Sequence, residues 1–464
     1  MEKSVDVAEF IDNRRLSPYQ YLVIGLCALI MLLDGFDTQA ISYAAPMIAK
    51  EWSLTTAVLG PIFSSALVGL MVGYLVVPPL SDRFGLRRTI MVGTLFFAIA
   101  TLLAVFARGV TELMALRFLA GIGLGGVIPS AVAMTCDLSP KRVRATTVLV
   151  IYCGFSLGFI VAGFFAAKLL PDHGWRSLFW IGGLTPIVLT GILMFLLPES
   201  PQHLARYRIA PERIVATLRR IDSTATVDIT TDFIAAKREA GSTVSQLFVQ
   251  GRWIATLLLW LAFFIILALF YALQSWLPTI LHKLDYSMTQ VALTTSLTTA
   301  GGILIVFIIG PCMDRVGYYA TISALYFAGA VIVVLVGMAL TMPAVVVMGA
   351  AFLAGTCISG GSKGVIALAA VHYHAAVRST GVGWALGVGR LGGITGPLVV
   401  GLAFSAGWTP SQVFYAGGVP LLIAGLAILI VARDKHRARA GYEQPLPETK
   451  ATPISRSPAI GTSE

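Results

Sequence analysis

The chain has 464 residues, of which 57% are hydrophobic and only 12% are charged. A soluble protein of this length could not bury so much apolar surface in its core, so the composition excludes the ordinary soluble classes. Apolar runs long enough to cross hydrocarbon recur along the whole length and indicate an all-α polytopic membrane protein. Transmembrane β-strands would be shorter and would alternate in polarity, a pattern that the sequence lacks.

Twelve of these runs are predicted to span the membrane as helices, in two sets of six. In chain order they cover roughly residues 20–42, 58–80, 89–107, 111–135, 145–168, 178–197, 254–280, 290–312, 319–340, 343–370, 380–405 and 412–432. The predicted domains are an amino-terminal arm (1–19), a six-helix bundle (20–197), a central loop (198–253), a second six-helix bundle (254–432) and a carboxyl-terminal tail (433–464).

The two polar segments after the bundles carry different predictions. The central loop has apolar residues at helical spacing, Ile214, Leu218 and Ile221, which indicate short surface helices on the cytoplasmic face. The tail is rich in Pro, Ser, Thr and charge, a composition typical of disorder.

The net charge of +10 follows the predicted topology. Of the 33 Lys and Arg residues, 25 fall on the side that holds both termini, five fall in the opposite loops, and three lie within spans. This bias predicts cytoplasmic termini in a multi-pass protein of the cell inner membrane. The predicted topology accounts for the excess of basic residues, so the net charge does not indicate binding to nucleic acid. The expected partners are the lipid bilayer and a transported solute, and the chain is expected to work as a monomer.

The five cysteines lie in or beside spans, and none falls in an outer loop. They therefore indicate no disulfide framework, and their spacing fits no metal site. No nucleophile and base occur together in a pattern that would indicate catalysis, so we expect neither a cofactor nor an enzyme.

An internal repeat supports two related halves. Pro78-Pro-Leu-Ser-Asp82-Arg83-Phe-Gly85 follows the second span, and Gly310-Pro-Cys-Met-Asp314-Arg315-Val-Gly317 follows the eighth. Each copy stands at the same place in its half, on the cytoplasmic side. Parallel repeats of this kind are typical of two six-helix bundles related by an axis along the membrane normal.

Asp34 and Asp37 stand inside the first apolar run. An acid near the centre of a bilayer costs about 2.5–3.5 kcal/mol on insertion scales. Residues three apart lie on the same side of a helix, so the two carboxyls are expected to face one polar cavity. They predict a site for a proton or a polar substrate.

Several motifs resemble the major facilitator superfamily, over roughly residues 20–432. The loop Asp82-Arg83-Phe-Gly85-Leu-Arg87-Arg88 resembles the superfamily's cytoplasmic loop, although Pro78 stands where that motif usually begins with Gly. Arg117 with the glycines after it resembles the superfamily's fourth-helix pattern. Pro198-Glu-Ser200, after the sixth span, resembles another of the superfamily's motifs. The resemblance implies twelve transmembrane helices in two pseudo-symmetric six-helix bundles.

Within that superfamily, Asp34-Gly-Phe-Asp37 resembles the first-helix motif of the aromatic acid:proton symporters, the 4-hydroxybenzoate and benzoate type. Trp276-Leu-Pro278 and Gly389-Arg390-Leu-Gly392 resemble the same group. Phe159 replaces the Pro that marks drug:proton antiporters, which favours import. The resemblance implies proton-coupled import of an aromatic carboxylic acid by alternating access. The alternatives are a transporter of a non-aromatic organic acid or other metabolite, an exporter, and a membrane sensor of aromatic acids.

An aromatic carboxylate needs a cation, and Arg117, Lys363 and Arg390 are the basic residues within the predicted spans. We expect Arg390, then Lys363, to meet the carboxylate, because Arg can bind it bidentately. Arg117 is expected to pair with Asp34 or Asp37. For each cation the alternative is a fixed interhelical salt bridge or a charge that reaches the interface.

The coupling and ring-binding roles have their own candidates. Asp34 and Asp37 would titrate as a coupled pair, and one of them could instead be a permanently paired structural acid. The ring candidates are polar or aromatic residues of core-type helices, namely Tyr152, Phe155, Tyr271, Gln274 and Trp384. In such helices aromatic residues commonly serve packing or interfacial belts instead.

The duplicated loops predict a cytoplasmic gate whose charges bridge the halves in one state and separate in the other. The gate candidates are Asp82, Arg83, Gly85, Arg87, Arg88, Asp314, Arg315, Gly317 and Arg378. The alternative is that the basic residues serve membrane topology alone.

Overall fold

The computed structural model describes residues 4–235, 244–248, 253–373 and 378–442. In that part of the chain, twelve helical spans are long and apolar enough to cross a membrane. The first half contains α2 (Pro18–Glu51), α3 (Thr56–Phe84), α4 (Leu86–Leu103), α5 (Val110–Asp137), α6 (Lys141–His173) and α7 (Arg176–Leu196). The second contains α10 (Trp253–Lys283), α11 (Met288–Leu304) with α12 (Val306–Val316), α13 (Tyr318–Ala339), α14 (Ala344–His372), α15 (Arg378–Ser405) and α16 (Pro410–Tyr442).

The twelve predicted spans are confirmed, one for one, and several helices continue beyond the apolar run. The first helix begins at Pro18 because Ser17 forms a capping box with Gln20, and it runs on to Glu51. The twelfth span ends at Arg433, and its helix α16 continues to Tyr442, into the predicted tail. The remainder of the predicted tail, residues 443–464, lies outside the described residues.

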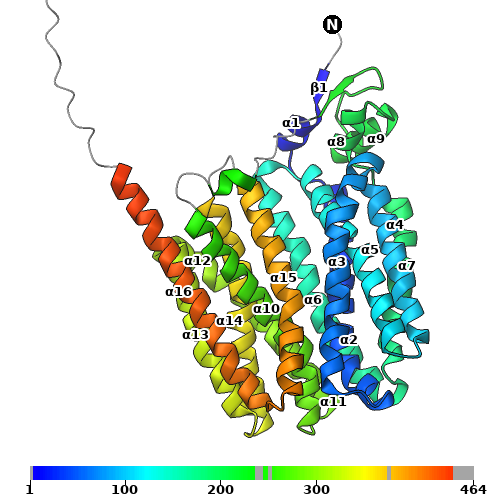
Figure 1. The fold of residues 1–464 in the computed structure, drawn as a ribbon. Coiled ribbons are helices and arrows are strands. Elements are labelled where there is room, and N and C mark those ends of the chain that lie inside the picture. The colour runs from blue at the N-terminus through cyan, green and yellow to red at the C-terminus, as the bar shows by residue number, and fades with distance from the viewer. Residues whose placement is uncertain (1–3, 236–243, 249–252, 374–377, 443–464) are drawn as a thin grey trace, which may run out of the picture.

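The two halves share one packing scheme (Figure 1). The first and fifth spans of each half pack together, as α2 with α6 and α10 with α15. The second and fourth pack as α3 with α5 and α11 with α14, and the third and sixth as α4 with α7 and α13 with α16. The same three helix pairings occur in both halves, so the repeat in the sequence is also a repeat in the structure.

The repeated loop has the same backbone turn in both copies. Gly85 ends α3 with φ of 96°, and Gly317 ends α12 with φ of 103°. Non-glycine residues rarely adopt this region, so each copy keeps a glycine where the chain reverses into the next helix. The two Asp-Arg loops are therefore equivalent in backbone as well as in sequence.

Gly35, between the two acids of α2, allows α2 and α6 to approach closely. A Cβ on Gly35 would lie 2.0 Å from the Phe155 carbonyl oxygen, which no side chain tolerates. Gly158 meets the Leu32 carbonyl oxygen in the same way, at 2.1 Å. The small residues thus fix the helix that carries both acids against α6.

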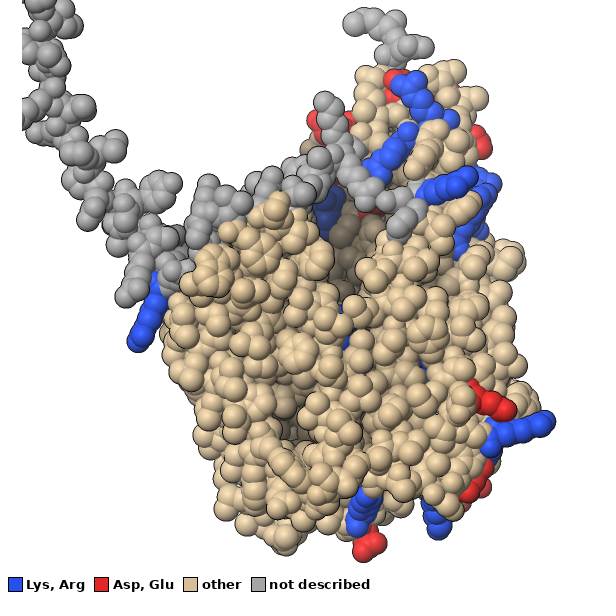
Figure 2. Space-filling model, in the orientation of Figure 1, with Lys and Arg blue, Asp and Glu red and all other residues tan. Residues whose placement is uncertain are grey.

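The halves meet closely at the end of the bundle away from the termini. The Ser64 hydroxyl of α3 donates to the Ile394 carbonyl oxygen of α15, over 2.8 Å. Phe63 packs edge-on against Trp276 of α10, with ring centroids 5.3 Å apart. At the opposite end, which carries both termini, the surface is hollowed between the halves (Figure 2).

The amino-terminal arm is folded, which the sequence analysis did not predict. Strand β1 (Ser4–Asp6) pairs in parallel with β2 (Asp232–Ile234) of the central loop. Helix α1 (Val7–Asp12) lies against α8 (Pro201–Tyr207), and α9 (Pro211–Ile221) follows. The predicted surface helices are confirmed, because Ile214, Leu218 and Ile221 form the buried face of α9. Two short 3₁₀ turns complete the elements, η1 (Ala104–Phe106) and η2 (Val244–Leu247).

Candidate functional site

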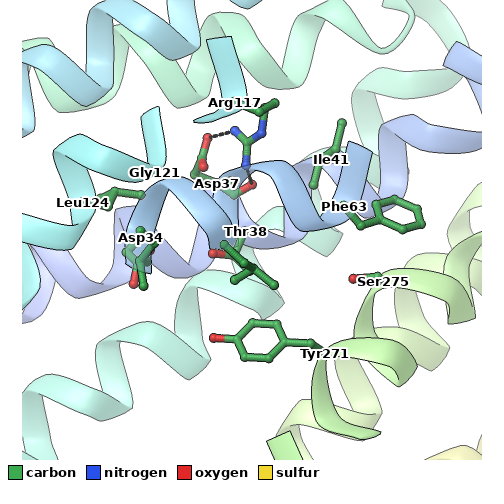
Figure 3. A pocket seen from close by; sticks show the side chains of 13 residues that line it. Asp34, Asp37, Thr38, Ile41, Phe63, Arg117, Gly121, Leu124, Tyr271 and Ser275 are labelled. Atoms are coloured by element: carbon green, nitrogen blue, oxygen red, sulfur yellow. Dashed lines mark hydrogen bonds and ion pairs between the residues drawn. The ribbon is translucent and has the colours of Figure 1, made fainter. Parts of the chain in front are cut away.

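The Asp37 side chain forms a buried ion pair with Arg117. Arg117 Nη1 lies 2.6 Å from Asp37 Oδ1, and the two side chains are only 1% and 3% exposed. The Arg117 Nη2 also donates to the Asp37 backbone carbonyl, over 3.3 Å, and the Thr101 hydroxyl donates to Asp37 Oδ1. Three helices, α2, α4 and α5, therefore hold this pair within the amino-terminal half (Figure 3).

Asp34 lies one turn earlier on α2 and is equally buried, with 2% of the residue exposed. Its Oδ1 has no hydrogen-bond partner, and no ion pair is found for it among the described residues. The charged groups close enough to act on it electrostatically are Arg390, Asp37 and Arg117. Figure 3 shows Asp34 set apart from the Asp37–Arg117 pair. One acid is thus held in an ion pair and the other is not.

Arg390 projects from α15 and connects the two halves. Its Nη1 donates to the Tyr271 hydroxyl of α10 over 2.7 Å, and its Nη2 donates to the Tyr74 hydroxyl of α3 over 3.2 Å. Tyr152 of α6 lies within electrostatic reach of Arg390 and Asp34. In the described ranges, no carboxylate forms an ion pair with Arg390. The Arg390 guanidinium therefore donates to neutral phenol oxygens. An anion in their place would bind to it more strongly.

A small cavity lies between the halves at this level. Its volume is about 20 Å³, and it is lined by Asp34, Asp37, Arg117 and Tyr271, with apolar residues of α3 and α5. Figure 3 shows Tyr271 facing the acids of α2 across it. An apolar cavity of about 150 Å³ binds benzene. The cavity is therefore too small for an aromatic ring in this arrangement. The two halves, or the side chains that line the cavity, must move apart before a ring can bind.

Lys363 and Gln274 lie in the second half. The Lys363 ammonium donates to the Gly302 carbonyl oxygen over 2.7 Å, and it is close enough to Cys153 of α6 to interact electrostatically. The Gln274 amide donates to the hydroxyls of Thr298 and Thr299, each over 3.2 Å. Lys363, like Arg390, is a cation without an acid partner in the described part of the chain.

The predicted ring contacts divide into two groups. Tyr271 lines the cavity, and Tyr152 is close enough to Asp34, which also lines it, to interact electrostatically. Gln274 does not line the cavity, and its amide donates to Thr298 and Thr299. Phe155 packs edge-on against Phe159, 4.9 Å between centroids, while its backbone meets Gly35. Trp384 is 49% exposed and stacks on Trp260 near the start of its helix, so the structure does not bring it to the cavity.

Tyr74, Gln39 and Thr101 are the polar neighbours that the sequence analysis missed. Tyr74 and Thr101 each stand alone in an apolar run, whereas Gln39 follows Asp37 and Thr38. Gln39 is five residues after Asp34, about 140° away around the helix, so its spacing places it on another face. Tyr74 and Thr101 belong to other helices, so their approach depends on tertiary packing.

The loop of the first half is fixed by Glu199. The Arg87 and Ser200 backbone N–H groups both donate to Glu199 Oε1, and the Arg87 guanidinium donates to the Met194 carbonyl oxygen. A Cβ on Gly85 would lie 2.3 Å from Glu199 Oε2, so a larger residue here would displace the carboxylate that holds the loop.

The other gate candidates make fewer contacts. Arg83 and Arg88 are exposed, as are Asp314 and Arg315 of the second copy, and Asp314 lies 3.5 Å from the Tyr318 hydroxyl. The side chains of Asp82 and Arg378 lie outside the described residues. In the described ranges, no group of His, Cys, Asp or Glu side chains could hold a metal ion.

Comparison with known proteins identifies the family. The sequence profile of the Major Facilitator Superfamily matches residues 27–397 and 259–461. The chain belongs to the major facilitator superfamily. It is therefore a multi-pass membrane transporter, as the resemblance of its motifs implied, and not an enzyme.

Relatives and solved structures match nearly the whole of this superfamily member. The chain is 36% identical to the 4-hydroxybenzoate transporter of Pseudomonas aeruginosa, over 93% of this chain and 97% of that protein. It is 34% identical to the gallate transporter of Pseudomonas putida, over 96% and 99%. The xylose transporter from E. coli has the same fold, with a TM-score of 0.67 at 17% identity over 88% and 95%.

Proposed function

We propose that this protein is a secondary active transporter that imports an aromatic carboxylic acid of the hydroxybenzoate type by proton symport. The 4-hydroxybenzoate and gallate transporters are 36% and 34% identical to it over nearly their whole length. Both names describe ring-hydroxylated aromatic acids. Asp34, Asp37, Arg117 and Arg390 all fall inside the part of the chain that the Major Facilitator Superfamily profile matches.

Arg390 is the proposed site of the substrate carboxylate, and its geometry carries the proposal. It is a cation between the halves whose hydrogen bonds, at 2.7 and 3.2 Å, go to the neutral phenols Tyr271 and Tyr74. A carboxylate would replace neutral acceptors by a charged one, and charge-assisted bonds are roughly twice as strong. Tyr271, Tyr152 and Gln274 would then surround the ring, and Lys363 would supply a second positive charge.

Asp34 is the proposed proton carrier, with Asp37 as the structural acid. In the empty transporter the Arg390 charge stabilises ionised Asp34. When a carboxylate binds Arg390, that stabilisation is shared between two anions, and a buried second anion is costly. Protonation of Asp34 then accompanies carboxylate binding, which makes proton and substrate move together. Asp37 is unsuited to this role because Arg117 neutralises it within its own half.

Alternating access would follow from rocking of the two six-helix halves. We propose that residues 20–197 and 254–432 move as units about the site. The contacts of Phe63 with Trp276 and of Ser64 with Ile394 would open to admit substrate, while the Asp-Arg loops would close the opposite end. The charge bias assigns that opposite end, with both termini, to the cytoplasm of a cell inner membrane. One chain contains a complete site, so the working unit is a monomer.

Uptake into proteoliposomes tests this function. Purified protein is reconstituted, and accumulation of labelled 4-hydroxybenzoate is measured with and without an imposed inward proton gradient. We expect accumulation above the external concentration that a protonophore abolishes. A panel of benzoate, hydroxybenzoates and non-aromatic acids defines the substrate class. If no aromatic acid accumulates in response to the gradient, the proposal is wrong.

A further inference from the structure

Two hydroxyl groups on the wall of the small cavity form no hydrogen bond within the described part of the chain. They belong to Thr38 of α2 and Ser275 of α10, and both residues line the cavity. Figure 3 shows the two side chains together with Tyr271. Each half of the transporter therefore presents one hydroxyl to the space between the halves.

Buried hydroxyls elsewhere in the bundle commonly bond to their own helix. Ser130, Thr135 and Thr190 each donate to the backbone carbonyl oxygen four residues earlier, over 2.8, 2.9 and 2.7 Å. Bonding back along the helix in this way satisfies a serine or threonine without any other partner. Thr38 and Ser275 make no such bond, so their hydroxyls are available to a group that enters the cavity.

Thr38 and Ser275 lie at the same level of the bundle. The residues that follow and precede them are in direct contact, because the Gln39 Nε2 donates to the Gln274 backbone carbonyl oxygen over 3.3 Å. Helices α2 and α10 are the first spans of their halves, and six spans separate their starts, so they run in the same direction. The two hydroxyls therefore face the cavity from equivalent places on opposite halves.

The cavity has a second polar level one helical turn away. Thr38 is four residues after Asp34 on α2 and shares its face of the helix, and Ser275 stands in the same relation to Tyr271 on α10. Tyr271, which accepts from Arg390, lies within electrostatic reach of Asp34. Four residues of helix rise about 6 Å. This spacing is close to the distance between the two substituents of a para-substituted benzene ring.

The rest of the lining suits the faces of a ring. Asp37 and Arg117 satisfy each other through their ion pair, and most of the remaining lining residues are apolar, among them Phe63, Leu67 and Leu124. Once the cavity widens to admit a ring, the carboxylate lies toward the first polar level and the opposite end of the ring lies toward the two hydroxyls.

We propose that Thr38 and Ser275 determine specificity by hydrogen bonding to a hydroxyl on the substrate ring, para or meta to the carboxylate. This inference rests on the proposed transport of aromatic acids and specifies which of them the site prefers. A hydroxyl both donates and accepts, so one ring hydroxyl bonds to both residues at once. An unsubstituted ring leaves both without a partner, a methoxy group offers no proton, and a hydroxyl ortho to the carboxylate lies at the wrong level. Sites that hydrogen-bond to a substrate hydroxyl discriminate against analogues that lack it.

The experiment compares acids that differ only at the ring substituent. Uptake of labelled 4-hydroxybenzoate is competed by unlabelled 4-hydroxybenzoate, 2-hydroxybenzoate, 4-methoxybenzoate and benzoate. Wild type should prefer 4-hydroxybenzoate to each of the others by about 3- to 10-fold, because a hydrogen bond between neutral groups contributes on that scale.

The variants Thr38→Val and Ser275→Ala remove the hydroxyls with little change of shape. Each should lower the preference about twofold or more, and the double variant should abolish it, through weaker binding of 4-hydroxybenzoate at an unchanged affinity for benzoate. The matched control is Thr94→Val on α4. Its hydroxyl also lacks a partner, but the residue is 3% exposed and does not line the cavity, so the preference should stay as in wild type.

Three results would overturn the subsite. Wild type takes up aromatic acids but does not distinguish 4-hydroxybenzoate from 4-methoxybenzoate, or the double variant keeps the preference, or it binds all the acids more weakly in equal proportion. A single variant that keeps the full preference removes its residue from the subsite. All of these results leave transport of aromatic acids intact. Absence of uptake of every aromatic acid by wild type would instead refute the proposed function, and the subsite with it.

Discussion

Arg117 and Asp37 are joined by an ion pair of 2.6 Å in which both side chains are almost fully buried. Removal of either partner leaves an uncompensated charge inside the membrane-spanning bundle. We expect Asp37→Asn and Arg117→Gln each to destabilise the protein by about 3–5 kcal/mol. Thermal unfolding of the purified transporter in detergent measures the loss.

The double variant Asp37→Asn with Arg117→Gln separates this structural role from a coupling role. It removes both charges together and should recover most of the stability lost in each single variant. If the single variants unfold like wild type, the pair does not hold the amino-terminal half together. If the double variant still accumulates substrate, Asp37 is not the proton carrier.

Asp34 is the acid on which proton coupling should depend. Asp34→Asn keeps the size of the side chain and removes the titrating group. We expect this variant to lose gradient-driven accumulation, because no proton accompanies the carboxylate, while it still exchanges labelled for unlabelled substrate across the membrane. Counterflow and gradient-driven uptake are measured on the same proteoliposomes. Accumulation that responds normally to pH in Asp34→Asn would remove this acid from the mechanism.

The fold could be predicted almost completely, because a bilayer admits few solutions. Every backbone polar group within hydrocarbon must be satisfied inside its own helix, so apolar length alone locates the spans. The break at Ile305, between α11 and α12, has no such signal and was missed. The folded arm was missed too, although Asp6 caps α1 and Val7, Phe10 and Ile11 form its buried face. These signals are short, and they become decisive only once β2 and α8 are in place.

The charged residues of the candidate site could be predicted from the sequence, but the residues with which they pair could not. Asp34, Asp37, Arg117 and Arg390 stand out because charge within a span is expensive. Which acid pairs with Arg117 depends on the phase of α5 against α2, which no spacing along the chain reveals. Tyr74 and Gln39 are neutral and scattered, so the sequence offers no reason to prefer them to other polar residues of the spans.

Arg390 should determine the affinity for the carboxylate. Arg390→Gln removes the charge but keeps hydrogen-bonding capacity toward Tyr271. A hydrogen bond to a charged group contributes about 1.5–3 kcal/mol, so the KM for the aromatic acid should rise about 10- to 100-fold. Arg390→Lys should lie between this variant and wild type, because a lysine keeps the charge without the fork. An unchanged KM in Arg390→Gln would move the carboxylate to Lys363.

The arm should stay docked on the central loop across neutral pH. The Thr224 hydroxyl and the Arg14 guanidinium, which is 2.6 Å away, hold the pKa of Asp222 at about 2. Because the folded pKa is depressed, the stabilisation is present above the unfolded value of about 3.9 and is lost only as the pH falls toward 2. Limited proteolysis of the arm should therefore not change between about pH 5 and 8.

Asp222→Asn should speed cleavage at every pH in that range, and Glu212→Gln, an exposed acid of α9, serves as the control. Cleavage that accelerates below pH 6 in wild type would contradict this assignment.

Cys153 should report which end of the transporter is open. Cys153 is exposed on α6 and is within electrostatic reach of Lys363 of the other half, whereas Cys27 and Cys357 are buried. The closed contacts of Phe63 and Ser64 lie on the far side of the site from the termini. A charged, membrane-impermeant maleimide should therefore label Cys153 from the side that carries the termini and not from the other.

Inside-out and right-side-out vesicles separate the two sides, and Cys153→Ser gives the background from the remaining cysteines. Substrate should slow the labelling by narrowing access between the halves. Equal labelling from both sides would mean that the end closed by Phe63 and Trp276 admits solvent, and the proposed direction of access would be wrong.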